Sequence, residues 1–146
     1  MDKDSSITKI RIILVSHGNL AKAMLENVEM LMGPQENIGA YSLMRNENPD
    51  DFMTLLRNEI SLHGKENVIF ISDLMNGTPC NILMMMTRDY PDLYHITGMN
   101  LAMVIGCITA RSDHPDATAE RICERTLAYA EDSILDVRVL LDSIGV

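Results

Sequence analysis

Basic residues, cysteines and long apolar runs are all scarce in this chain of 146 residues, and each shortage excludes a class of function. Lys and Arg total 12 against 21 Asp and Glu, so the formal net charge is −9 at pH 7. A chain this acidic is poorly suited to holding nucleic acid or anionic lipid by bulk charge. No segment reaches the ~18 consecutive apolar residues of a membrane span, and the first residues lack the apolar core of a signal peptide. We therefore expect a cytoplasmic protein.

The cysteines argue against both a disulfide framework and a metal site. Cys80, Cys107 and Cys123 are odd in number and have no CxxC spacing, which is typical of reduced thiols. No His or Cys lies at ligand spacing from any of them, so we predict no metal site. Methionine is abundant instead, and the run at residues 84–86 is expected to be mostly core, since Met commonly fills gaps there.

Apolar, strand-like segments alternate with amphipathic helical segments along the whole chain. This alternation predicts an α/β fold with an open, mainly parallel sheet and helices on both faces. We expect one domain over residues 9–146, after a short disordered lead-in at residues 1–8. The predicted strands cover residues 10–15, 38–44, 68–71, 93–97 and 137–141.

Polar residues follow two of these strands, at the edge where an open parallel sheet places its ligands. After the first strand, Gly18 permits a tight turn, and the free N–H groups of the next helix form an anion site. His17 beside it could attack a phosphoryl group and carry it covalently. Asp73, after a neighbouring strand, would fix the tautomer of its ring. The hydroxyls of Ser16 and Thr78 could donate hydrogen bonds to the phosphoryl oxygens.

These residues alone leave a second interpretation open, in which His17 is structural and Asp73 caps a turn. The other histidines are weaker candidates for chemistry. His63 is expected at the carboxyl end of a helix, where a cation meets free carbonyls. His95 should flank or start a strand, and His114 should be solvated in a charged turn.

The pattern around His17 and Asp73 resembles the IIA domain of the mannose family of the bacterial sugar phosphotransferase system. The resemblance runs from residue 10 to the C-terminus, and the matching segments come in the family's order. The segment Asp73-Leu-Met-Asn-Gly-Thr-Pro-Cys-Asn81 resembles the family's Asp-x-x-x-Gly-Ser-Pro-x-Asn element. The other matching segments are residues 12–18, 29–33, 35–39 and 98–101.

The resemblance implies a phosphotransferase that works through a phosphohistidine and needs no cofactor. His17 would accept a phosphoryl group from HPr and pass it to a IIB component, which serves sugar uptake by the membrane subunits IIC and IID. Asp73 would orient and stabilise the imidazole, and Thr78 matches a family Ser near the site. The family also implies a homodimer that exchanges a C-terminal strand, for which residues 137–141 are the candidate. Since the sequence ends at Val146, we expect IIB to be a separate polypeptide.

Three positions depart from the family pattern, and they bear on partners rather than on phosphorylation. Asn76 replaces the first Gly of Gly-Gly-Ser-Pro, Cys80 replaces a common aromatic, and Asn19 stands where a larger residue is frequent. A phosphocarrier subunit of a dihydroxyacetone kinase and a non-catalytic regulatory or binding module are the alternatives. A histidine phosphatase is disfavoured, because Ser16 stands where those enzymes have Arg. The identity of the sugar is not indicated, since that selectivity lies in other subunits.

Overall fold

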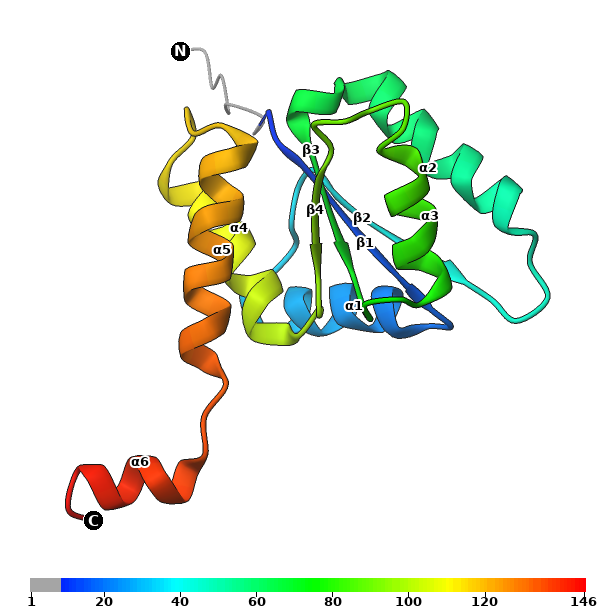
Figure 1. Ribbon diagram of the computed structural model, residues 1–146. Helices are drawn as coiled ribbons and strands as arrows, with labels where there is room; N and C mark the ends of the chain where they lie inside the picture. The colour runs from blue at the N-terminus through cyan, green and yellow to red at the C-terminus, as the bar shows by residue number, and fades with distance from the viewer. Residues whose placement is uncertain (1–8) are drawn as a thin grey trace.

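The computed structural model describes residues 9–146 and contains one sheet of parallel strands in the order β2-β1-β3-β4 (Figure 1). The lead-in predicted at residues 1–8 lies outside the described residues. The parallel pairing confirms the α/β class predicted from the alternation of segments. The strands are β1 (Arg11–His17), β2 (Ile38–Leu43), β3 (Val68–Ser72) and β4 (Tyr94–Thr97).

Helices cover both faces of the sheet, as the sequence predicts. One face packs against α1, α4 and α5, and the other packs against α2 and α3 (Figure 1). Because the strands are parallel, their carboxyl ends meet at one edge, and α1, α3 and α4 begin there. The helices are α1 (Leu20–Met32), α2 (Pro49–His63), α3 (Thr78–Met86), α4 (Leu101–Asp113), α5 (Ala119–Ser133) and α6 (Val137–Ser143), with the short 3-10 helix η1 (Lys65–Asn67) before β3. Among residues 9–146, no helix combines the length and the apolar character needed to cross a lipid bilayer.

The central strand β1 shows why the sheet is covered on both sides. Ile12 and Leu14 point into the core under α1, α4 and α5, while Ile13 and Val15 point into the core under α2 and α3. All four side chains are fully buried. A strand with two buried faces needs an almost continuous apolar sequence, which β1 and β3 both have. The register places Val15 opposite Ser72, so that the end of β1 and the residue after β3 lie side by side.

A charged cluster lies between α2 and the sheet at the end where β1 begins. Glu59 of α2 is buried and accepts hydrogen bonds from Arg11 at 3.0 and 3.1 Å and from the Tyr41 hydroxyl at 2.5 Å. Burial alone would raise the pKa of Glu59, but the hydrogen bonds from Arg11 and Tyr41 outweigh it and hold that pKa below its usual value. Burial and the Glu59 contact raise the pKa of Tyr41 to about 12. His63 ends α2 as predicted, with its Nε2 3.5 Å from a Glu59 oxygen.

The strand predicted at residues 137–141 is wrong, because these residues lie in α6. Asp136 caps this helix by accepting hydrogen bonds from the backbone N–H groups of Arg138 and Val139, at 3.0 and 3.3 Å. Alternating apolar residues can pair as a strand only where a neighbouring strand supplies the partner groups. The sheet formed by residues 9–146 supplies none for this segment, and a helix satisfies its own backbone groups locally. The exchange of a C-terminal strand is therefore not seen in this single chain, and α6 stands away from the sheet (Figure 1).

The methionine run is also less buried than the sequence suggests. Met86 is fully buried against the sheet, but Met84 and Met85 are 45% and 50% exposed. The cause is helical geometry, since three consecutive residues spread over most of a turn and only part of α3 faces the core.

Candidate functional site

The structure brings His17 and Asp73 into direct contact at the carboxyl edge of the sheet. His17 is the last residue of β1, and Asp73 follows β3, the strand paired with β1. The His17 Nδ1 lies 2.8 Å from the Asp73 Oδ2, and the backbone N–H of His17 donates to the same oxygen at 3.0 Å. Ring and backbone of His17 are thus both held by one carboxylate oxygen.

The carboxylate of Asp73 is itself fixed and shielded. Its other oxygen accepts the backbone N–H of Leu74 at 2.9 Å, and its side chain is 9% exposed, against 47% for His17. An ionised carboxylate can only accept, so the Nδ1 of His17 carries the proton and the Nε2 of the neutral ring keeps a lone pair. A nucleophilic nitrogen on a half-exposed ring is the arrangement that a covalent carrier needs.

Gly77 lies against the edge of the ring, and the sequence analysis did not assign it a place in the site. A Cβ added at Gly77 would overlap the Cε1 of His17 and would lie 3.1 Å from its Nε2. The position therefore requires a residue without a side chain, and this requirement comes from close approach, not from backbone conformation. The signal available in the sequence was a glycine directly before the helix start at Thr78-Pro79.

Ser16 and Gly18 shape the turn beside His17 instead of facing the open side of the ring. Ser16 is fully buried, and its Oγ accepts the backbone N–H of Ala21 at 2.7 Å, inside the first turn of α1. Its hydroxyl is directed at the Gly18 carbonyl, 3.4 Å away. Gly18 has a φ of +52° and donates its N–H to Leu43 at 2.9 Å. Together they set the angle at which α1 leaves β1.

Two helix N-termini flank the ring. The first, α1, begins at Leu20, and the second, α3, begins at Thr78, directly after Gly77. Thr78 is exposed, and its hydroxyl has no hydrogen bond to any residue in the described part of the chain. Free N–H groups and helix dipoles favour negative charge at such ends. The exposed nitrogen of His17 thus lies where a phosphoryl group would be stabilised.

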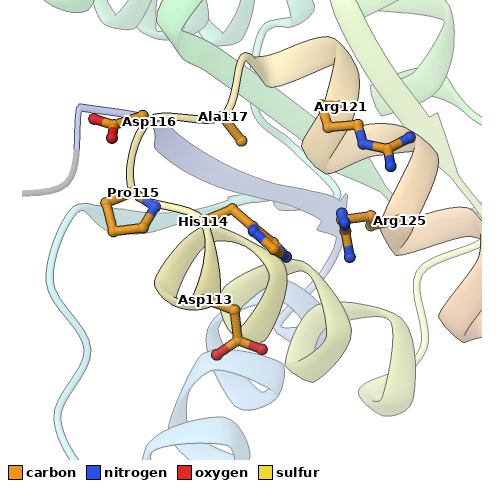
Figure 2. A pocket seen from close by; sticks show the side chains of 7 residues that line it. All are labelled: Asp113, His114, Pro115, Asp116, Ala117, Arg121 and Arg125. Atoms are coloured by element: carbon orange, nitrogen blue, oxygen red, sulfur yellow. The ribbon is translucent and has the colours of Figure 1, made fainter.

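The described residues form no candidate metal site. Within residues 9–146, no three His, Cys, Asp or Glu side chains come together as metal ligands would. A cavity of about 350 Å³ lies at the α4–α5 turn, at the end of the sheet opposite to the carboxyl ends of the strands (Figures 1 and 2). It combines the acidic Asp113 and Asp116 with the basic Arg121 and Arg125, around a half-buried His114. Its charges are balanced, so it does not favour an anion as the His17 edge does.

Comparison with known proteins identifies the family of this chain. Residues 11–124 match the sequence model of the family described as "PTS system fructose IIA component". The mannose-specific EIIAB component of Escherichia coli (strain K12) is 30% identical over 107 residues, which are 73% of this chain and 33% of that protein. The chain thus spans 33% of the length of that relative. The sorbose-specific EIIA component of Klebsiella pneumoniae is 27% identical over 121 residues, covering 83% of this chain and 87% of that protein.

Solved structures show the same fold. The phosphotransferase system component EIIA from Streptococcus agalactiae superposes with a TM-score of 0.79 at 24% identity, over 89% of this chain and 98% of that one. The mannose/sorbose specific IIA subunit from Enterococcus faecalis gives a TM-score of 0.73 at 23% identity, over 87% and 93% of the two chains. The sequence match over residues 11–124 assigns the family: this chain belongs to the mannose-type IIA family of the sugar phosphotransferase system.

Proposed function

We propose that this protein is a phosphoryl carrier in which His17 accepts a phosphoryl group from phospho-HPr and passes it to a IIB component. The observation that carries the proposal is the 2.8 Å contact between the His17 Nδ1 and Asp73. It leaves the Nε2 unprotonated on a half-exposed ring, between the starts of two helices. Asp73 is the second catalytic residue and holds the ring from its shielded side. Thr78 supports the phosphoryl site at the surface, and Ser16 and Gly18 support it from the turn.

The reaction follows from the tautomer. The Nε2 lone pair attacks the phosphorus of the donor phosphohistidine, a new N–P bond forms, and the donor's N–P bond breaks with its electron pair returning to the donor ring. The His17 ring then carries a positive charge, which the Asp73 carboxylate stabilises through the Nδ1–H. The phosphoryl oxygens then lie close to the N-terminus of α3 and to the Thr78 hydroxyl. The N–H groups and the hydroxyl replace part of the hydration of these oxygens. Transfer to IIB is the same step in reverse.

The charge of the chain suits a carrier that meets its partners briefly. At a net charge of −9, it would be drawn to basic surfaces on HPr and IIB, which speeds encounter without making the complexes long-lived. The role places the protein in the cytoplasm, where IIB would pass the phosphoryl group to sugar imported through IIC and IID.

We also propose a homodimer formed through the C-terminal segment. Several apolar side chains near α6 are largely exposed, among them Ile134 at 76% and Val139 at 60%. A second copy of the chain is the occupant that the family implies. The strand exchange expected from the sequence would require residues 137–141 to leave the helix seen here and pair with the partner's sheet.

The decisive test is phosphorylation by phosphoenolpyruvate, enzyme I and HPr, followed by intact-mass analysis at neutral pH. We expect one acid-labile phosphoryl group on the wild-type chain, none on His17→Ala, and onward transfer when a IIB component is added. His114→Ala is a matched control that should remain phosphorylated, because His114 lies at the other end of the sheet. Phosphate on His17→Ala would refute the assignment. An unmodified wild-type chain, with working controls, would favour the regulatory or binding module.

A further inference from the structure

A small polar cluster lies beneath the site, where β3 and β4 end. Ser72, the last residue of β3, is fully buried, and its Oγ lies 2.7 Å from the Nε2 of His95 in β4. The same hydroxyl donates to the Oγ1 of Thr97 at 2.9 Å. The sequence predicts only that His95 flanks or starts a strand, and it is the second residue of β4. Its position opposite Phe70, two pairs before Ser72 and Thr97, puts it on the same sheet face as they are, the face that α2 and α3 cover.

The Ser72 hydroxyl has one proton and two lone pairs, and it faces two partners. With its proton directed at Thr97, a lone pair faces the Nε2 of His95. Burial lowers the pKa of His95 to about 4, so its ring is neutral at pH 7. In the tautomer that carries the ring proton on Nε2, His95 donates to Ser72, and the buried hydroxyl then has a partner on each side.

Ser72 connects this cluster to the site through the backbone. Its carbonyl accepts the N–H of Met99 at 3.0 Å, so the residue is tied to β4 and the following turn by both backbone and side chain. The next residue, Asp73, reaches the opposite way and accepts the N–H groups of His17 on β1. The position of the end of β3 between β1 and β4 therefore decides where the Asp73 carboxylate lies.

We infer that His95 is a positioning residue, which acts through the Ser72 hydroxyl to hold the end of β3 so that Asp73 keeps the His17 ring in its reactive orientation and tautomer. The consequence for the transfer rate rests on the proposed function. The consequence for the ring of His17 does not, because it concerns only the resting protein. Loss of the His95 ring would leave the buried Ser72 hydroxyl without one of its two partners and free the strand end to shift. Displacements of about 1 Å can cost about 100-fold in rate, so a partial shift should cost about tenfold.

Three variants on β4 separate positioning from stability. His95→Leu removes the N–H, and His95→Gln keeps an N–H donor near the place of the Nε2. Ile96→Val is the matched control, since it lowers stability by about 1 kcal/mol on the same strand but points into the other core. Ser72→Ala repeats the test from the other partner if His95→Leu does not fold.

Two readouts are needed, and the first is independent of phosphorylation. In ¹⁵N spectra of the imidazole rings, His17 should show the Nδ1–H tautomer in the wild type, in His95→Gln and in Ile96→Val, and a mixture of tautomers in His95→Leu. In transfer from phospho-HPr, His95→Leu should lower the rate at saturating donor about tenfold and change the half-saturating concentration less than about twofold. His95→Gln should restore the rate.

The inference is overturned if folded His95→Leu keeps the wild-type His17 spectrum, or if its rate falls no further than that of Ile96→Val. If no variant, the wild type included, accepts phosphate, the proposed function fails. The ring spectra then still decide whether His95 positions the site.

Discussion

Replacement of Asp73 by Asn tests how the site holds its histidine. In the wild-type chain, the Asp73 Oδ2 accepts the backbone N–H and the Nδ1–H of His17, and the Oδ1 accepts the N–H of Leu74. An amide has only one accepting oxygen, and its NH₂ group can only donate. If Asn keeps its oxygen toward His17, its NH₂ group opposes the Leu74 N–H. If it turns over, its NH₂ group faces Nδ1 and favours the tautomer with the proton on Nε2.

Both orientations should slow the proposed phosphoryl transfer, for different reasons. With the NH₂ group toward Nδ1, most molecules lose the Nε2 lone pair. With the oxygen toward Nδ1, the lone pair remains, but the carboxylate that stabilises the charged ring is gone. A hydrogen bond to a charged group contributes about 1.5–3 kcal/mol. That range corresponds to about a 10- to 150-fold slower transfer. His17 should still become phosphorylated in the end, because the nucleophile itself is present.

The assay is rapid-quench transfer from phospho-HPr, followed by intact-mass detection of the phosphorylated chain. Asp92→Asn is the matched control, because the Asp92 side chain is 81% exposed and its ion pair with Lys65 is long, at 3.7 Å. The transfer rate of Asp92→Asn should stay within about twofold of the wild-type rate, because surface ion pairs contribute little to stability. A folded Asp73→Asn chain that transfers at the wild-type rate would show that the carboxylate does not govern the ring.

Three further perturbations have clear expected outcomes. Gly77→Ala should slow transfer about 10- to 100-fold, because the new methyl group displaces the His17 ring; Gly106→Ala, which makes a similar overlap with Tyr129 far from the site, should not. Glu59→Gln should lower the free energy of unfolding at pH 7 by roughly 1–3 kcal/mol in urea titrations. Folding lowers the pKa of Glu59 from 4.5, so the stabilising effect of its carboxylate is present above that value and is lost as pH falls through the folded pKa. The difference in unfolding free energy between Glu59→Gln and the wild type should therefore shrink below pH 4.5. A difference that stays constant with pH would contradict this. Val139→Asp should convert a dimer to a monomer in light scattering, whereas Leu62→Asp on α2 should not; an unchanged mass would exclude α6 from the interface.

The parts of the fold that could be predicted are those in which each segment carries its own signal. Residues 12–15 of β1 and 68–71 of β3 are all apolar and mostly β-branched, a pattern that strands buried on both faces require. The meeting of His17 and Asp73 followed from two parallel strand ends at one edge. Ser16 shows the limit of residue-by-residue reasoning: it is in phase with Ile12 and Leu14, so it faces the core beneath α1 and cannot reach the exposed side of the ring.

The C-terminal segment could not be predicted because its signal depends on a partner. Val137, Val139 and Leu141 alternate as in a strand, but four of the seven residues in α6 are apolar and Asp136 is a good helix cap. Local sequence favours neither state strongly, so the availability of a second strand decides. Gly77 and the cluster of Ser72 and His95 were missed for a related reason, since their contacts join residues far apart in the chain.

The two nitrogens of His17 have a further consequence for kinetics. One nitrogen is permanently engaged by a shielded carboxylate, so the ring offers a single reactive atom. A single atom cannot be in contact with two macromolecules at the same time. Under the proposed function, donor and acceptor would have to take turns on the same small surface, and each would inhibit the other by competition. Steady-state data should then give parallel double-reciprocal lines, and an excess of either unphosphorylated partner should slow the overall flux of phosphate.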